Sequence, residues 1–442
     1  MKNDSNSIIK FIFSPVGKYL ISVIIIFSLI EIILILGNQV TPIDATIWQV
    51  IGIVSLIFFI LLSSNLNIRS ILVVILFYQL FFSFSLQFYY IVTTGSPIYP
   101  EAIDVLSYID LAEQTKELDF SSAIKIISNR YPDLSDYGAP LFLKYVFQIG
   151  GTLQHSMQVL IIINSIIQTI ISIYVYKLSL IVFKDKKLAT WTLLLWSFNM
   201  ASIFFNVSGL KEPLFCLLCT LTLYSMYKWK ISKSYSALCL FIISLISTWF
   251  FRYFVSIFFI LIFIGFCIIP RLFNKHFILI CISATLVCLS FTDILIYFMP
   301  ELTYAVNFVE ATKPNGLTLY IYYLLSFLSP IPKFISNGDT FSIIIGEYAF
   351  IKFGFSICAL VGSWFLIKKH FYIAYPLIVL SLFTTLLLIF SGAYIDFRFS
   401  YVTMPAFFIL MLGGFKYTQK YIKVGYLLFS SIIIYLFNTG SY

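Results

Sequence analysis

The chain contains the run MQVLIIINSIIQTIISIYVYKLSLIVF, residues 157–183, in which Lys177 is the only charged residue. About 20 predominantly apolar residues are enough for a helix to cross a hydrocarbon core of about 30 Å. Apolar runs of similar length recur along the whole chain. A membrane β-barrel would instead need alternating segments of about 10 residues. We therefore predict an all-α fold, a polytopic bundle of transmembrane helices.

The composition excludes an ordinary soluble protein. Of the 442 residues, 60% are hydrophobic and 11% are charged, whereas soluble domains carry about 25% charged residues. The net charge of +9 does not indicate a nucleic-acid partner, because the basic residues occupy short loops between apolar runs, which is the positive-inside pattern. These basic residues are Arg69, Lys184, Lys186, Lys187, Lys228, Lys230, Lys233, Arg271, Lys275, Lys368, Lys369, Lys416, Lys420 and Lys423.

The hydropathy pattern predicts about 11–13 spans and a cytoplasmic N-terminus, because Lys2, Lys10 and Lys18 precede or begin the first apolar run. With that orientation, the alternation of spans places every basic loop on the cytoplasmic face. The predicted spans are 19–37, 47–63, 70–92, 157–183, 188–206, 212–228, 234–250, 253–270, 277–298, 341–366, 371–391, 400–416 and 421–438.

Within a single integral membrane domain, 1–442, two long loops fall on the outer face, at 93–156 and 299–340. Between residues 93 and 137 the first loop has eight acidic and three basic residues. It contains two amphipathic stretches, 104–118 and 120–129, and then the short apolar segment YGAPLFLKYVFQIGG, which predicts an interfacial helix. In the second loop, Pro330 and Pro332 break an apolar segment, since proline removes a backbone donor and kinks a helix. Irregular backbone at membrane depth is tolerated only beside protein or a water-filled cavity.

Asp104 and Tyr108, in the first outer loop, are the candidate catalytic pair. They are four residues apart and therefore share one face of a helix. A carboxylate at the membrane surface is suited to act as general base for a hydroxyl nucleophile. The alternative interpretation is a solvated acidic loop.

Isolated charges at the outer ends of other spans form a second candidate group, suited to phosphate binding. Glu212 next to Pro213 is typical of helix capping, but Lys211 opposes the helix dipole and is not explained by capping. An arginine among aromatic residues can also simply reach for the interface. The group comprises Lys211, Glu212, Arg252, Lys333, Asp396 and Arg398.

The cysteines and histidines do not indicate a metal or redox centre. All seven cysteines lie in apolar runs, and Cys216-x-x-Cys219 has no second pair, so we interpret both as core residues. The three histidines are far apart in sequence. No cofactor is required, although a divalent metal bridging a phosphate and a carboxylate is compatible with the sequence.

Several of these stretches resemble the C-type (GT-C) membrane glycosyltransferases. DVLSYIDLA (104–112) resembles their D-x-x-x-Y-x-x-x-A element, and YGAPLFLKYVFQIGG resembles the proline-containing helix that follows it. FKDKKLAT (183–190) and SGLKEPLF (208–215) resemble links of their next module, and YIDFRFSYVTMPAFFILMLGG (394–414) resembles an arginine-then-proline start of a late span. The resemblance covers about residues 85–230 and 390–415. The chain departs from the family in two extra spans before the acidic loop and in lacking a second acidic residue beside Asp104.

The resemblance implies a glycosyltransferase that takes a sugar from a polyprenyl-phosphate or polyprenyl-diphosphate carrier and attaches it to an acceptor on the outer face of a membrane. It implies Asp104 as base, Tyr108 as its neighbour, and Lys211, Arg252 and Arg398 as candidates for the lipid phosphate. The expected location is the bacterial cytoplasmic membrane, in surface-polysaccharide synthesis. The expected partners are the lipid-linked sugar or oligosaccharide and membrane lipids.

Two other functions remain open from the sequence. An O-antigen polymerase that joins lipid-linked repeat units has the same general hydropathy and long outer loops. A polysaccharide flippase or transporter is the main alternative that is not an enzyme. Transporters place ionisable residues near the midplane and contain paired repeats, whereas this chain has its charges at the outer rim and no evident repeat.

Overall fold

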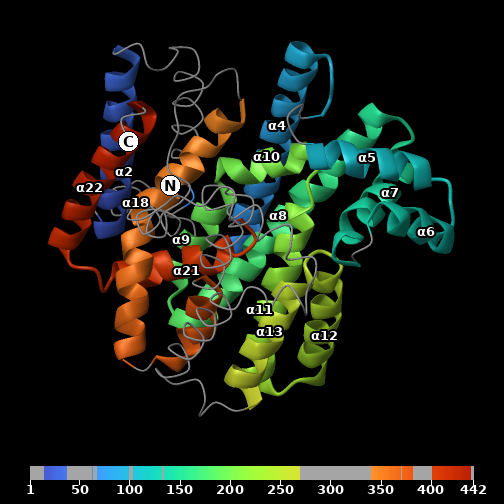
Figure 1. Cartoon of the computed structure of the whole chain (residues 1–442). Helices are drawn as coiled ribbons and strands as arrows, with labels where there is room; N and C mark the ends of the chain where they lie inside the picture. The colour runs from blue at the N-terminus through green and yellow to red at the C-terminus, as the bar shows by residue number, and fades with distance from the viewer. Residues whose placement is uncertain are drawn as a thin grey trace, which may run out of the picture. The chain divides into compact units, whose positions relative to one another are not determined.

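The computed structural model describes residues 14–36, 62, 67–98, 103–131, 134–268, 340–369, 371–381 and 401–439. These residues are predominantly helical, and among them there is no β-strand (Figure 1). The principal helices are α2 (Pro15–Leu36), α4 (Ile68–Thr94), α5 (Ile103–Thr115), α6 (Phe120–Arg130), α7 (Gly138–Gly150), α8 (Leu153–Phe183), α9 (Lys186–Ser197), α10 (Met200–Ser208), α11 (Glu212–Ser232), α12 (Tyr235–Trp249), α13 (Tyr253–Phe263), α18 (Thr340–Lys368), α21 (Met404–Phe415) and α22 (Lys420–Thr439). The prediction of an all-α chain is confirmed for the described residues.

Three of these helices are long and apolar enough to cross a membrane: α4, α8 and the part of α18 from Ile351 to Lys368. A fourth candidate span is the pair α9 and α10, whose axes differ by 46°. The predicted span 277–298 lies outside the described residues, as do the span 47–63 except for residue 62 and nearly all of the predicted second outer loop, 299–340. The total of about 11–13 spans therefore stays a prediction.

The chain divides into two compact units, Met1–Phe11 with Gly52–Leu261 and Ile12–Ile51 with Ile262–Tyr442. The first unit contains α4–α12 and most of α13. Its central element is α8, which packs against α4, α7, α9, α10 and α11. A helix as apolar as α8 is stabilised by contacts on several sides, and half of its most apolar stretch is buried inside the protein.

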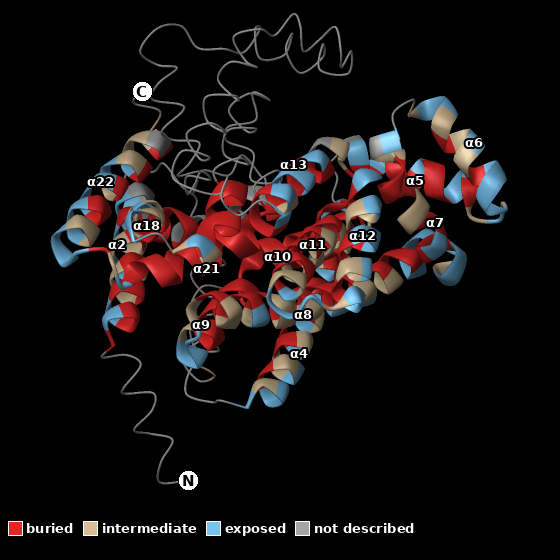
Figure 2. Ribbon diagram, turned by 90° about the horizontal axis from the view of Figure 1, so that it is seen from below, coloured by how far each residue is buried: buried red, intermediate tan, exposed pale blue. Residues whose placement is uncertain are grey.

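The predicted span 188–206 is a broken helix rather than a continuous one. α9 ends at Ser197, and Asn199 begins α10 by accepting a hydrogen bond from the Ser202 backbone N–H at 2.9 Å. Asparagine side chains offer the backbone such local bonds in place of helical ones, which explains the break. Every residue of α10 is buried, and Figure 2 shows it as a continuously buried element.

The two amphipathic stretches predicted within residues 93–156 are the helices α5 and α6, and the segment YGAPLFLKYVFQIGG forms the helix α7. The outer position of these helices and the interfacial position of α7 stay predictions. Asp119 caps α6 by accepting from the backbone N–H groups of Ser121 and Ser122. A 3₁₀ turn, η1 (Leu134–Asp136), lies between α6 and α7 in the chain. α5 packs against both α6 and α7, and α7 packs against α8, so these helices are joined to the core of the unit.

In the second unit, α18 packs against α2, α21 and α22. α18 and α21 cross at two glycines, Gly362 and Gly414, and a Cβ on Gly414 would overlap the Cys358 carbonyl oxygen. Small residues of this kind let the backbones of two membrane helices approach closely. The hydroxyls of Tyr19 (α2) and Tyr426 (α22) donate to the α18 carbonyls of Gly354 and Phe353, at 2.8 and 2.7 Å.

Candidate functional site

The candidate site lies in the first unit, and we call it the Lys211 site. It is built from α5, from the 3₁₀ turn before α7, from the start of α11 and from the turn between α12 and α13. Its residues are Asp104, Tyr108, Asp136, Lys211, Glu212 and Arg252, whose charges act on one another.

Lys211 and Asp136 form an ion pair, with 2.6 Å between the lysine Nζ and the carboxylate Oδ1. The two partners differ in exposure: the side chain of Lys211 is 2% exposed and that of Asp136 is 30% exposed. The ammonium group is thus enclosed by protein, while solvent reaches one side of the carboxylate. The pair joins residues 75 positions apart and holds the 3₁₀ turn against the start of α11.

The sequence SGLKEP determines the position of Lys211 at the start of α11. α10 ends at Ser208, and Gly209 follows with φ +75°, a left-handed conformation that glycine adopts without strain. The Ser208 hydroxyl accepts from the Leu210 N–H at 3.3 Å, and Pro213 stands in the first turn of α11. Proline fits this turn because its missing N–H would have no helical partner there. Lys211 is therefore the last residue before the helix.

Tyr108 is the buried centre of the site. The Lys211 Nζ lies 5.8 Å from the centre of the tyrosine ring. Burial raises the pKa of the Tyr108 phenol well above its usual range, and the nearby carboxylates of Asp136 and Glu212 raise it further. The positive charge of Arg252 lowers the phenol pKa, but burial and the carboxylates outweigh this effect. The phenol therefore stays protonated at neutral pH and is available as a hydrogen-bond donor.

The turn that carries Arg252 is fixed by contacts on both sides. The backbone N–H of Gly138, at the start of α7, donates to the Phe250 carbonyl at 2.8 Å. The Phe251 ring lies where a Cβ of Gly138 would be, 2.6 Å from its ideal position, and it stacks on the Phe215 ring of α11 at 5.8 Å. Arg252 itself is partly exposed, so it is a more accessible cation of the site than Lys211.

Asp104 lies in the first turn of α5 and is exposed, one helical turn before the buried Tyr108. A carboxylate at the start of a helix is favoured by the helix dipole. Its charge still reaches the Tyr108 ring, where it adds to the rise in the phenol pKa. The predicted arrangement of Asp104 and Tyr108 on one α-helix is therefore present.

The electrostatic state of Lys211 is unusual for a lysine. Burial, together with the neighbouring Arg252, lowers its pKa from 10.5 to about 8, against the opposing effects of Asp136 and Glu212. Lys211 thus remains mostly cationic at neutral pH and loses its charge as the pH rises through about 8.

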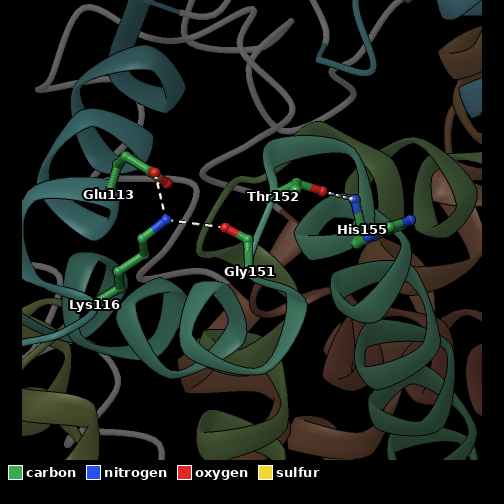
Figure 3. A network of polar contacts seen from close by, with 5 residues as sticks. All are labelled: Glu113, Lys116, Gly151, Thr152 and His155. Carbon is green, nitrogen blue, oxygen red and sulfur yellow. Dashed lines mark hydrogen bonds and ion pairs between the residues drawn. The ribbon is translucent and has the colours of Figure 1, made fainter.

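A second polar network fixes the far end of α5. The Lys116 ammonium donates to the Glu113 carboxylate at 2.5 Å and to the Gly151 carbonyl at 2.9 Å (Figure 3). The Thr152 hydroxyl then caps α8 by accepting from the His155 backbone N–H at 3.4 Å. α5 is therefore attached to the junction of α7 and α8 at one end, while its other end carries Asp104.

The structure brings together five of the eight residues predicted from the sequence: Asp104, Tyr108, Lys211, Glu212 and Arg252. Lys333, Asp396 and Arg398 lie outside the described residues. The sequence analysis did not select Asp136, the ion-pair partner of Lys211. A signal for it existed, because Asp136 is the last acidic residue of the loop and stands directly before the apolar YGAP segment.

No group of three histidine, cysteine or carboxylate side chains that could hold a metal ion is present in the described part of the chain. Comparisons of the sequence with protein-family models and curated proteins, and of the fold with solved structures, gave no match.

Proposed function

We propose that the protein is a membrane glycosyltransferase that transfers a sugar or oligosaccharide from a polyprenyl-phosphate or polyprenyl-diphosphate carrier to a hydroxyl acceptor. The observation that carries this proposal is the Lys211 site, where an exposed carboxylate, a protonated phenol and two cations meet beside long apolar helices. Glycosyl transfer to a hydroxyl needs a base for the acceptor and positive charge for the departing phosphate.

In this proposal the acceptor oxygen attacks the anomeric carbon of the sugar, and the bond from that carbon to the phosphate oxygen breaks. Asp104 takes the proton of the acceptor hydroxyl. The bonding electrons leave with the carrier phosphate, whose added negative charge is stabilised by the accessible guanidinium of Arg252. The Tyr108 phenol serves as a hydrogen-bond donor. The Lys211–Asp136 pair positions the start of α11, and the Lys211 ammonium supplies a fixed positive charge behind it.

The position of the site along α11 supports a reaction at a membrane surface. α11 is not one of the candidate spans named above, but it packs along α8, which is one, and its 21 residues at 1.5 Å per residue extend about 31 Å, close to the thickness of the hydrocarbon core. Lys211 and Glu212 stand at its first end, and Lys228, Lys230 and Lys233 stand at or after its other end. A basic end marks the cytoplasmic side, so we place the Lys211 site on the outer face of a bacterial cytoplasmic membrane.

The direct test is transfer from a radiolabelled polyprenyl-phosphate sugar by the purified protein, with product measured as label in glycan. We expect Asp104→Asn to abolish transfer, because an amide cannot accept the proton. Asp110→Asn is the matched control: Asp110 is also exposed and on α5, but it faces away from Asp104. Full activity of the Asp104 variant would remove the base from this mechanism.

Polymerisation of lipid-linked repeat units would use the same chemistry at the same site. The two reactions differ in what a deletion strain accumulates. Lipid-linked single repeat units indicate a polymerase, whereas truncated or unmodified units indicate a transferase.

The break between α9 and α10 favours a second candidate function, transport of a polar solute. Broken helices near the membrane midplane form the substrate sites of many transporters, and this pair is bent by 46° at Phe198–Asn199. Uptake or flipping of a lipid-linked sugar in proteoliposomes, without any transfer product, would favour transport over catalysis.

A further inference from the structure

Three neighbouring helical segments of the first unit carry buried amide and hydroxyl side chains at spacings close to one helical turn. α4 and α8 each present them at every fourth residue, so they form one face of each helix. α10 packs against both α4 and α8. We call the set the amide seam: Gln79, Ser83 and Gln87 of α4, Asn164, Gln168 and Ser172 of α8, and Ser197, Ser202 and Asn206 of α9 and α10.

One part of the amide seam is satisfied within the protein. The Gln79 Nε2 donates to the Ser197 carbonyl at 2.7 Å and to the Ser202 hydroxyl at 2.9 Å. The Asn206 Nδ2 donates to the Gln79 Oε1 at 2.8 Å and to the Ser83 hydroxyl at 3.1 Å. These bonds tie α4 to both halves of the broken helix, as expected for polar groups that hold membrane helices together.

Another part of the seam is buried without protein partners. Neither the Oε1 nor the Nε2 of Gln168 makes a hydrogen bond to any group that the structure describes, although the residue is only 1% exposed. The same holds for the Gln87 Nε2 and for the Oδ1 atoms of Asn164 and Asn206. A buried amide without partners is strongly unfavourable, and more so between apolar helices.

The unsatisfied atoms include both hydrogen-bond donors and acceptors, and this decides which kind of ligand can bind them. Gln87 and Gln168 offer donors, while Asn164, Gln168 and Asn206 offer acceptors. A cation would satisfy only the acceptors, and an anion would satisfy only the donors. A hydroxyl group both donates and accepts, and the nine side chains of the seam are uncharged at neutral pH.

One end of the seam is also close in sequence to the Lys211 site. Asn206 precedes Lys211 by five residues, and Gly209 between them lies against Val105 of α5 and Met157 of α8. α5 is the helix that carries Asp104 and Tyr108. A group held by Asn206 is therefore within a few helical turns of the candidate catalytic residues.

We propose that the amide seam is a binding site for neutral hydroxyl groups, either those of ordered water or those of a sugar. The binding site itself does not depend on the transferase proposal; only its occupation by a sugar of the donor or acceptor rests on it.

The test is the thermal stability of the full-length protein in lipid nanodiscs, which avoid detergents with sugar head groups. Gln168→Met replaces the amide by an apolar chain of similar length, and Ile171→Met, at another buried position of α8, measures the packing cost of the new side chain. Each protein is melted alone and with increasing glucose, galactose or N-acetylglucosamine. A bound sugar raises the apparent Tm with its concentration.

We expect Gln168→Met to lower the apparent Tm by several degrees more than Ile171→Met, because the wild-type amide is satisfied by hydroxyl groups that the variant cannot bind. A rise in Tm with sugar that is present in the wild type and absent from Gln168→Met assigns the site to sugar. The expected loss without such a rise assigns it to water alone. A Gln168 variant that melts no lower than Ile171→Met would overturn the proposal, since removal of an unsatisfied amide stabilises a protein. None of these outcomes depends on transfer activity.

Discussion

Replacement of Lys211 by methionine should make the protein more stable near neutral pH while removing its proposed activity. In the folded protein, burial and the neighbouring Arg252 lower the pKa of Lys211 from 10.5 to about 8. Because one pKa unit corresponds to about 1.36 kcal/mol, the charged lysine costs the folded state about 3 kcal/mol relative to the unfolded chain. Methionine keeps the apolar chain and removes this cost. Asp136 loses its partner, but solvent reaches its carboxylate, so this loss is small.

The pKa of Lys211 also determines how the stability and the activity of the protein depend on pH. Between about pH 8 and 10.5 the unfolded chain holds a proton on Lys211 that the folded protein has released, so wild-type stability rises with pH in this window. The advantage of Lys211→Met is therefore full below about pH 8 and disappears by about 10.5. Activity of the wild type should fall above about pH 8, where the fixed positive charge is lost.

Thermal denaturation in nanodiscs across this pH range measures both effects. Lys228→Met is the matched control, because Lys228 is an exposed lysine of the same α11 helix, and its replacement measures the effect of the same change of side chain at the protein surface. A Lys211→Met variant that is less stable than the wild type at neutral pH would contradict the cost assigned to the buried charge. A difference between the two proteins that stays constant up to about pH 10.5 would contradict it equally.

Four further substitutions test the packing and chemistry of the two units. Arg252→Lys keeps the charge but loses the planar fork, and we expect transfer to fall about tenfold or more, measured as kcat with the lipid-linked donor. Gly138→Ala places a Cβ 2.6 Å from the Phe251 ring and should lower stability by about 1–3 kcal/mol in thermal denaturation. Gly425→Ala, a helical glycine with nothing within 4 Å of the added Cβ, should leave stability unchanged or slightly raised. Gly414→Ala meets backbone atoms of α18 rather than a side chain, so we expect a loss at least as large as that for Gly138→Ala, with reduced yield of folded protein.

The helical elements were largely predictable from the sequence, because the hydropathy pattern and the capping residues act locally. The amphipathic stretch after residue 103 became α5, and YGAPLFLKYVFQIGG became α7. The break at Phe198–Asn199 was not predicted, since the apolar run continues through it. It depends on the Asn199 cap and on Gln79, which donates to the Ser197 carbonyl from a helix 118 residues away.

Most residues of the candidate site could be predicted from the sequence, but the contacts between them could not. Lys211 could be predicted as a site residue because its charge opposes the helix dipole at the start of α11. Its partner, Asp136, was one of eight acidic residues in the loop, and its place directly before the YGAP segment does not indicate that it pairs with Lys211. Only the packing of α7 against the α12–α13 turn, through Gly138 and Phe251, brings the 3₁₀ turn to the lysine. Long-range ion pairs of this kind follow from tertiary structure and not from spacing.

The burial of Lys211 has a consequence for ligand binding. A lysine that is enclosed by protein and close to Arg252 holds its proton weakly, so each negative charge brought near it raises its pKa and is itself stabilised in return. A carrier phosphate arriving at the exposed side of the site would therefore bind most tightly below about pH 8, where Lys211 is already protonated in the unbound protein. Above that pH its affinity falls, and its binding takes up protons. Proton uptake on addition of a polyprenyl phosphate, measured near pH 8 in weakly buffered nanodiscs, should be present in the wild type and absent from Lys211→Met. Equal uptake by both proteins would mean that the phosphate is bound elsewhere, and Lys211 would then be a structural residue whose charge is used only to hold Asp136.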